Sequence, residues 1–261
     1  GSTAMAGAAV LCCKGALAAG VGLLSLCVPR GAHSRLQGLP PEVMILPGGE
    51  GDLFEPKAVD ELEKYSAIVA GPGLGGGAAL SEETAYFLLE LWAAARVPVL
   101  YDADALPFAQ GSTRYDRVIT PHPGEAARIL GLGTLEVQGD RFKAVQALAT
   151  ESRVALLKGR NTLIAEDGHR VSINSTGCEV LATGGAGDVL SGVIGGLLCR
   201  GLGGRDAARV GAWVHGQAAD MLRQRRAVGW TAQDVVHEIP DAVAMLLDRR
   251  RVDRRVKDRS Q

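Results

Sequence analysis

Short apolar runs recur along the chain, and each of them ends in a polar or glycine-rich segment. Four of these runs do not alternate with polar positions: 67–70, 97–101, 118–120 and 154–157. Uninterrupted apolar runs of this length are typical of parallel strands that are buried on both faces, because a strand with one solvated face alternates. The pattern therefore predicts a mainly parallel sheet.

Helices are predicted between and after these runs. Ser81 can cap a helix that continues to Ala95, because two glutamates follow it in the first turn. Residues 15–28 indicate a buried helix that runs into a buried strand. Three further helices are expected towards the end of the chain, at 188–199, 206–225 and 231–248.

Residues 162–173 differ from the other strands because they indicate a hairpin about Asp167-Gly168. No linker or internal repeat divides the chain, so one three-layer α/β domain over 1–248 is expected, followed by a basic tail at 249–261. In such sheets ligands bind outside the carboxyl ends of the strands. The polar segments that follow the strands are therefore expected to share one crevice.

Composition narrows the classes of protein. Hydrophobic residues make up 47% and charged residues 22%, which excludes a disordered chain, and the net charge of −1 argues against a polyanion-binding protein. Residues 249–259 hold seven basic and two acidic residues, and we interpret them as a solvated helix end rather than a nucleic-acid or membrane patch. No apolar run is long enough to span a bilayer. The cysteines are odd in number and form no C-x-x-C motif, which fits a reducing cytosol without disulfides or a zinc site.

Two glycine clusters follow predicted strands. The first, at 71–76, matches G-x-G-x-x-G, but Pro72 removes an amide donor and Asp102 ends the next strand too far on for a dinucleotide-binding fold. No lysine follows the glycines, so a P-loop is excluded. We interpret this segment as a loop whose backbone a ligand can approach, and a tight strand-to-helix turn is the alternative.

The second cluster precedes an apolar helix. The backbone amides of Gly184, Gly185, Ala186 and Gly187 can form an anion hole at the helix N-terminus. Asp188 follows them, and a carboxylate there cannot attract phosphate. It can accept a proton from a hydroxyl that attacks a phosphoryl group. The alternative is that Asp188 only caps the helix.

Other polar residues also follow strands. His122 lies between two prolines that stiffen its loop, although a lone histidine is as often structural as catalytic. Lys158 and Gly159 could contact a nucleotide phosphate or simply form an exposed strand end. Asp102 and Asp104 could bind substrate or hydrated magnesium, or could serve only as turns and caps.

These motifs in this order resemble the ribokinase-like superfamily, and more closely the ADP/ATP-dependent NAD(P)H-hydrate dehydratases, the C-terminal-type domain of bifunctional nicotinamide-nucleotide repair proteins. The most specific strings are Thr120-Pro121-His122-Pro123-Gly124-Glu125 and Ala182-Thr183-Gly184-Gly185-Ala186-Gly187-Asp188-Val189-Leu190. The other matching segments, which extend the resemblance over essentially the whole chain, are Gly1-Ser2, 7–9, 71–75, 102–106, 158–159, 174–177, 215–216 and 231–234.

The resemblance implies a ribokinase-like three-layer α/β/α sandwich and a two-stage reaction. In that family, (S)-NADHX or (S)-NADPHX, which carries a hydroxyl on the reduced nicotinamide ring, is phosphorylated with ADP or ATP and Mg²⁺. Phosphate then leaves, which restores NADH or NADPH. Phosphate is a far better leaving group than hydroxide, and ADP is the expected donor because this chain resembles the bacterial members.

The resemblance also implies roles for individual residues, with Asp188 as the base at the hydrate hydroxyl. The residues expected to bind the hydrate are Ala8, Gly73, Gly75, His122 and Asp188. Those expected to bind the nucleotide are Lys158, Gly159, Arg160, Asn161, Thr162 and Gly187. Asp102, Asp104 and Asn174 are further candidates, and no metal ligand is assigned. Two positions depart from the family: Cys178 stands where relatives place Asn, and Ala186 where they place Ser or Thr.

A cytoplasmic homo-oligomer is expected, with a possible separate epimerase as partner and with neither nucleic acid nor membrane. Relatives carry a segment before the first Gly-Ser, so an N-terminal strand is expected to be missing. The competing hypothesis is a small-alcohol or vitamin kinase of the same superfamily, which would share the anion hole, although the string at 121–125 favours the dehydratase. A nucleotide-sensing module without catalysis is a third hypothesis, and Asp188 argues against it.

Overall fold

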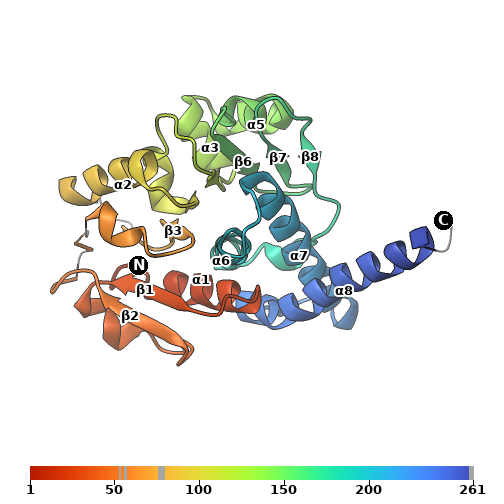
Figure 1. Cartoon of the computed structure of the whole chain (residues 1–261), viewed down its shortest axis with the longest axis horizontal. Coiled ribbons are helices and arrows are strands. Elements are labelled where there is room, and N and C mark those ends of the chain that lie inside the picture. The colour runs from red at the N-terminus through yellow and green to blue at the C-terminus, as the bar shows by residue number, and fades with distance from the viewer. Residues whose placement is uncertain (53, 56–57, 76–79, 259–261) are drawn as a thin grey trace.

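A mainly parallel sheet runs through the protein, and helices cover both of its faces (Figure 1). The computed structural model describes residues 1–52, 54–55, 58–75 and 80–258, with side chains as far as residue 248. Within these residues the sheet has the order β3-β4-β5-β6-β7-β8. Its strands are β3 Ile68–Ala70, β4 Val99–Tyr101, β5 Arg117–Ile119, β6 Arg153–Leu157, β7 Leu163–Ala165 and β8 Ser172–Ile173. The first four strands are parallel and the last two pair antiparallel, so the predicted parallel runs and the hairpin are confirmed.

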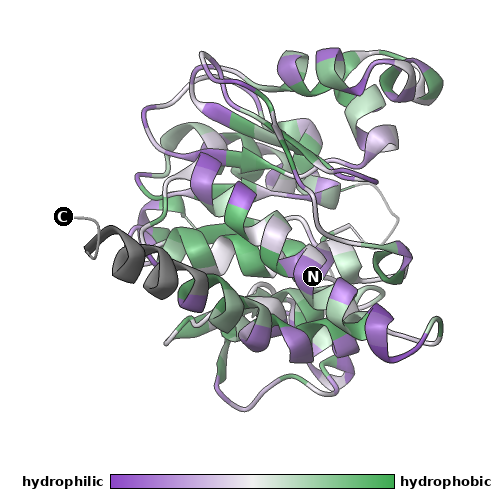
Figure 2. Cartoon of the chain, turned by 90° about the vertical axis from the view of Figure 1, so that its right-hand side faces the viewer, coloured by the Kyte–Doolittle hydropathy of each residue, from purple (hydrophilic) through white to green (hydrophobic). Residues whose placement is uncertain are grey.

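Successive residues of each central strand enter different cores, as the pleat requires. Leu100, Val118 and Leu156 pack against one group of helices, which is α1 Ala6–Ala18, α6 Ala186–Cys199, α7 Gly204–Arg225 and α8 Ala232–Asp258. Tyr101 and Ile119 pack against the other group, which is α2 Glu82–Ala94, α3 Pro123–Leu130, α4 Thr134–Gly139 and α5 Arg141–Leu148. In Figure 2 apolar residues dominate the inner strands and helices. The predicted three-layer architecture is therefore confirmed.

The N-terminal part of the chain adds a second, two-stranded parallel sheet of β1 Leu24–Val28 and β2 Val43–Pro47. The predicted order of helix and then strand over residues 15–28 is confirmed, but α1 begins earlier, at Ala6. Strand β2 was not predicted, and two of its apolar residues, Met44 and Ile45, are exposed. Short 3₁₀ helices occupy several connections: η1 Arg30–Arg35, η2 Val59–Leu62, η3 Ala103–Phe108 and η4 Glu179–Leu181.

Helix α1 crosses α6 at very short range, and glycines make this possible. A Cβ on Gly192 would lie 2.0 Å from the carbonyl oxygen of Cys12, and one on Gly15 would lie 2.4 Å from that of Val189. Any larger side chain at these positions would force the helices apart. The close approach places the middle of α1 against the glycine cluster that begins α6, where Leu11 lies next to Gly185.

Helix α8 extends to Asp258, ten residues beyond the predicted end at residue 248. The side chains of 249–258 and the whole of 259–261 lie outside the described residues, as do the glycines at 76–77. Within the described ranges, no helix is both long and apolar enough for a membrane span. None of the cysteines, which all lie in these ranges, forms a disulfide.

Candidate active site

The carboxyl ends of the parallel strands bring together the polar segments that follow them. Lys158, at the end of β6, donates its backbone amide to the Pro121 carbonyl after β5 at 2.9 Å. After β4, the Asp102 carbonyl lies so close to Gly71 that a Cβ there would be 1.7 Å from it. Gly71, at φ +122°, therefore has to be glycine. Segments that are far apart in sequence thus form one crevice.

The ammonium group of Lys158 lies at the centre of this crevice. Its Nζ is 2.8 Å from Oδ1 of Asp102 and 3.6 Å from Oε2 of Glu125. A Cβ built on Gly187 would be 3.5 Å from the same Nζ, so the charge also faces the start of α6. Burial alone would lower the pKa of Lys158, but the carboxylates of Asp102 and Glu125 outweigh it and raise the pKa. The side chain is therefore a fixed cation at neutral pH.

Asp102 is the buried carboxylate that binds the Lys158 ammonium group. It is only 2% exposed, and its Oδ2 accepts a hydrogen bond of 2.7 Å from Oγ of Ser191 in α6. The Ser191 hydroxyl lies 3.5 Å from Oγ1 of Thr120. Sequence reasoning missed Ser191, although its position three residues after Asp188 places both on one side of the helix. Asp102 thus links the end of β4, Lys158 and α6.

Asp188 lies in the first turn of α6, next to Gly187. Gly185 is the N-cap residue, at φ +88°, and a Cβ there would lie 2.3 Å from Cδ1 of Leu11 in α1. The capping position therefore belongs to Gly185 rather than to Asp188. Burial is the main cause that raises the pKa of Asp188 to about 6; Asp102 adds to the shift and Lys158 opposes it. A carboxyl group that titrates near neutrality is suited to accept and release a proton.

A buried histidine supports the same helix start. His215 in α7 is 5% exposed and forms a hydrogen bond with the Ala186 backbone. Burial lowers its pKa to about 4, so the ring is neutral at physiological pH. Its Nε2 is buried and has no hydrogen-bond partner among the described residues. Ala186, the first residue of α6, is therefore buried, and its backbone is bound to His215 of α7.

His122 caps helix α3. Its Nδ1 accepts hydrogen bonds from the amides of Gly124 at 3.0 Å and Glu125 at 3.3 Å, and its own amide donates to Oε2 of Glu125 at 2.7 Å. This reciprocal arrangement is a capping box with histidine in the usual place of serine. The side chain is 51% exposed, and its Nε2 lies 3.4 Å from Oε1 of Glu125. Both ring nitrogens therefore have partners at the start of α3, although about half of the side chain is exposed.

The first glycine loop packs against the start of α1. Gly73, at φ +62°, would place a Cβ 2.4 Å from the Met5 carbonyl oxygen and 3.1 Å from the Cβ of Ala8. The structure thus brings Ala8 and Gly73 together. The amide of Gly75 donates to Oδ2 of Asp104 at 2.8 Å, so Asp104 holds the loop rather than pointing away from it.

The loop after β6 has an unusual backbone. Gly159 has φ +136° and Asn161 has φ +53°, and Oγ1 of Thr162 donates to the Gly159 carbonyl at 3.0 Å. Arg160 and Asn161 are exposed. Asn174, the remaining candidate, instead donates to the Ala212 carbonyl of α7 at 3.0 Å.

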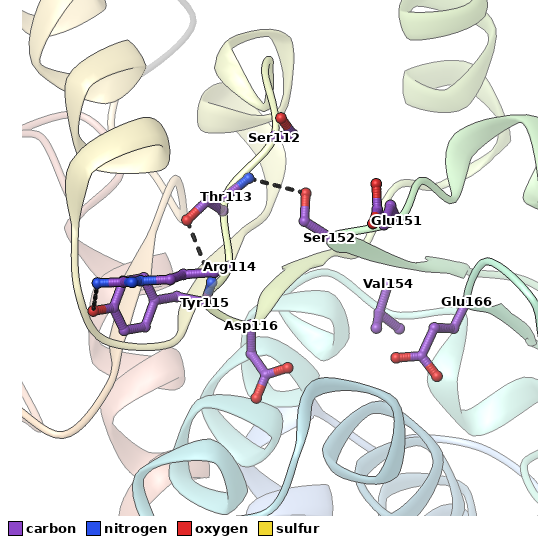
Figure 3. A pocket seen from close by; sticks show the side chains of 9 residues that line it. All are labelled: Ser112, Thr113, Arg114, Tyr115, Asp116, Glu151, Ser152, Val154 and Glu166. Carbon is purple, nitrogen blue, oxygen red and sulfur yellow. Dashed lines mark hydrogen bonds between the residues drawn. The ribbon is translucent and has the colours of Figure 1, made fainter.

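Two hollows lie near the central strands. One, of about 450 Å³, lies at the amino ends of β5 and β6, opposite the crevice described above (Figure 3). Its lining residues are Ser112, Thr113, Arg114, Tyr115, Asp116, Glu151, Ser152, Val154 and Glu166. The other, of about 640 Å³, is lined by residues of η3 and α3, including Ala103 and Glu125. Of these two hollows, only the second is lined by Glu125, the carboxylate that faces Lys158.

The fold is that of the ribokinase-like proteins. A ribokinase-like superfamily protein from Enterococcus faecalis is 22% identical with a TM-score of 0.69, and the match covers 90% of this chain and 81% of that one. The chain belongs to the NAD(P)H-hydrate dehydratase family, whose model matches residues 1–241. An ADP/ATP-dependent NAD(P)H-hydrate dehydratase from Bacillus subtilis, co-crystallised with ATP/Mg²⁺, is 28% identical with a TM-score of 0.80, covering 94% of this chain and 87% of that one. The resemblance inferred from the motifs is confirmed.

Curated relatives agree with this assignment. The bifunctional NAD(P)H-hydrate repair enzyme Nnr of Vibrio cholerae is 37% identical over 85% of this chain and 43% of its own length. The ADP-dependent (S)-NAD(P)H-hydrate dehydratase of Neisseria meningitidis is 39% identical over 72% of this chain and 64% of its own. The chain thus spans less than half the length of the bifunctional relative.

Proposed function

We propose that this chain catalyses the nucleotide-dependent dehydration of (S)-NADHX and (S)-NADPHX to NADH and NADPH, with ADP as the phosphoryl donor. The observation that carries the proposal is Asp188. It is a carboxyl group with a pKa raised to about 6, in the first turn of α6, beside the Gly187 backbone and within the field of Lys158. The names of the relatives from Neisseria meningitidis and Vibrio cholerae support the same reaction.

In the first stage Asp188 accepts the proton of the hydrate hydroxyl while that oxygen forms a bond to the transferred phosphorus. The bond between this phosphorus and the donor breaks, and AMP leaves when ADP is the donor. In the second stage the ring nitrogen supplies an electron pair, the carbon–oxygen bond breaks and phosphate departs. Loss of a proton from the neighbouring ring carbon restores the double bond. Asp188 thus serves as a general base.

The nucleotide side of the site has the groups that a phosphoryl transfer requires. The amides of Gly184, Gly185, Ala186 and Gly187 lie at the N-terminus of a 14-residue helix, where an anion is favoured. Lys158 adds a fixed positive charge, and the loop over 159–162 would contact the rest of the nucleotide.

Magnesium would be held mainly by the phosphates and by water. Across the described ranges, no group of three or more histidine, cysteine or acidic residues could hold a metal ion. Asp102, the buried carboxylate nearest the crevice, is already bound to Lys158 and Ser191. Mg²⁺ commonly keeps several waters and takes few protein ligands, so this arrangement is compatible with it.

The hydrate side would be formed by Ala8, Gly73, Gly75 and His122. Ala8 and Gly73 are adjacent, and Asp104 fixes the Gly75 amide, so this wall is preorganised. His122 would contact the hydrated nicotinamide through the exposed part of its ring. Asn174 would act indirectly, because it ties the segment after β8 to α7.

The wider setting follows from the same assignment. We propose that residues 1–248 act as one domain with 249–261 as a basic C-terminal tail, and that the chain is a cytoplasmic homo-oligomer. An epimerase activity would supply the (S)-hydrate, because the longer relatives carry the name of a bifunctional repair enzyme. Light scattering on the purified protein tests the oligomer.

The decisive assay incubates the protein with NADH hydrate, Mg²⁺ and either ADP or ATP. Return of the near-ultraviolet absorbance of the dihydropyridine, with one phosphate released per turnover, is expected with ADP. A stable phosphorylated product from small alcohols, without dehydration of the hydrate, would favour the kinase hypothesis. Nucleotide binding without turnover of any hydrate would favour a sensor.

A further inference from the structure

An arginine outside the crevice binds the backbone of the proposed nucleotide loop. Arg141 is the first residue of α5, and its guanidinium reaches the end of β6. Nη2 donates to the carbonyls of Leu157 at 3.3 Å and Lys158 at 3.4 Å, and Nη1 donates to that of Arg160 at 2.5 Å. One side chain therefore holds three carbonyls on either side of the turn at Gly159.

This turn has a backbone that needs external support. Gly159 at φ +136° and Asn161 at φ +53° are both outside the regions that most residues prefer. Such conformations persist where the surrounding structure fixes them, and they concentrate at functional sites. Arg141 lies against the turn itself, because a Cβ on Gly159 would be 3.1 Å from Nη2.

The position of Arg141 does not favour helix α5. A cation at a helix N-terminus is opposed by the helix dipole. Burial lowers the pKa of the guanidinium, and within the described structure its Nε is buried without a hydrogen-bond partner. The side chain therefore brings no benefit to its own helix, and its bonds all go to the β6 end and the loop.

We propose that Arg141 is a positioning residue for nucleotide binding, which holds residues 158–162 in the conformation that the nucleotide requires. The proposal rests on the proposed function, in which this loop meets the adenine nucleotide. Arg141 does not touch the reacting groups in this view. Preorganisation lowers the cost of ordering a loop on binding, so its loss weakens affinity rather than chemistry.

The chain offers a matched control at the other end of the same strand. Arg153 donates Nε to the Leu148 carbonyl and Nη1 to the Ala109 carbonyl, both at 2.7 Å. Arg141→Met and Arg153→Met therefore remove the same kind of backbone clamp from opposite ends of β6. Arg141→Lys keeps the charge but cannot hold three carbonyls at once.

We expect Arg141→Met to raise the KM for ADP by about tenfold or more while kcat and the hydrate KM change less than about threefold. Arg141→Lys should fall between Arg141→Met and the wild type, and Arg153→Met should lower thermal stability without moving either KM. If folded Arg141→Met changes both KM values in parallel, or neither of them, the positioning role is wrong.

Hydrogen exchange separates this proposal from the proposed reaction. In the nucleotide-free protein, Arg141→Met should speed amide exchange across 159–163, and Arg153→Met should not. This measurement needs no turnover, and calorimetric titration with ADP reports affinity directly. If the wild type fails to dehydrate NADH hydrate while Arg141→Met still shows faster exchange and weaker ADP binding than the wild type, that outcome would overturn the proposed function and keep the role of Arg141. Unchanged exchange in the loop would overturn the role of Arg141.

Discussion

The two ends of the central sheet both carry buried or half-buried charges, but those charges have different partners. At the amino ends, Arg117 is fully buried and donates to the carbonyls of Trp92 and Ala95, which close the C-terminus of α2. At the carboxyl ends, Lys158 faces the carboxylates of Asp102 and Glu125 and lies next to Gly187 at the start of α6. A cation bound to helix carbonyls has a structural role, whereas in the proposed reaction the cation held by carboxylates beside the start of α6 would bind a phosphate.

The presence of a surface hollow does not distinguish the amino ends of the strands from their carboxyl ends. The hollow in Figure 3 lies at the amino ends and is lined by carboxylates such as Asp116 and Glu166. The carboxyl ends instead contain Asp188, whose pKa is raised to about 6. A shifted pKa with a named cause is the better indicator of chemistry here.

The largest expected effect comes from Asp188→Asn, which tests whether the carboxyl ends carry the chemistry. The amide keeps the size of the side chain but cannot accept a proton. Turnover should fall by about 10²–10⁴, the usual contribution of a positioned general base, with little change in the hydrate KM. Steady-state kinetics with ADP and NADH hydrate measure this.

Asp116→Asn at the opposite end is the control, and it should leave kcat and both KM values unchanged. Near wild-type turnover in folded Asp188→Asn would remove the base assignment. Equal losses in both variants would show that the two ends do not differ in the way proposed.

The strands and helices of the central layers follow from local patterns, whereas several site contacts do not. Apolar runs and caps such as Ser81 were sufficient to place β3 and α2, because burial and capping are local signals. The pairing of Lys158 with Asp102 joins residues 56 apart, and only the sheet order brings them together. The role of Arg141 could not be predicted from the sequence either, because its partners are backbone carbonyls, which every residue carries. Motif strings identified Asp188 and His122 as candidates but not their environments.

The next largest effect is expected for Lys158→Met. A hydrogen bond to a charged group contributes about 1.5–3 kcal/mol, so the KM for ADP should rise by about tenfold to a hundredfold. The substitution also leaves Asp102 buried without its cation, which should lower the melting temperature. Kinetics and thermal unfolding measure the two effects separately.

The double variant Lys158→Met with Asp102→Asn removes the unpaired charge and should recover much of the lost stability. Its KM for ADP should stay high. If affinity returned together with stability, Lys158 would be a structural cation like Arg117, and the contrast between the two ends would fail.

A smaller effect concerns pH. Because Asp188 must be ionised to accept a proton and its pKa is about 6, kcat/KM should drop about tenfold per unit below that value and level off above it. The raised pKa also means that the folded state binds this proton more tightly than the unfolded state. The penalty to stability therefore grows as pH rises from the ordinary value of 3.8 through about 6, and stays constant above.

Asp188→Asn should accordingly be more stable than the wild type at neutral pH, by at most about 3 kcal/mol. The difference should vanish in acid, below the ordinary carboxyl pKa. Urea unfolding at both pH values measures it. A stability difference that does not depend on pH would mean that Asp188 titrates normally, and this would weaken the base assignment.

The smallest effect is expected at His122, where one ring has two roles. His122→Ala removes the cap of α3 and should lower stability by about 1 kcal/mol, the typical cost of losing an N-cap. It should also weaken binding of the hydrate several-fold, at about the strength of one hydrogen bond, while ADP binding is unchanged.

The variant His122→Asn separates the two roles of the ring, because asparagine is a good N-cap but its side chain is too short to present a group where the ring Nε2 lies. We expect His122→Asn to restore the melting temperature and not the hydrate affinity, measured by calorimetry with NADH hydrate. If capping alone restores hydrate binding, the ring acts only through α3, and His122 belongs with the structural groups of the amino end.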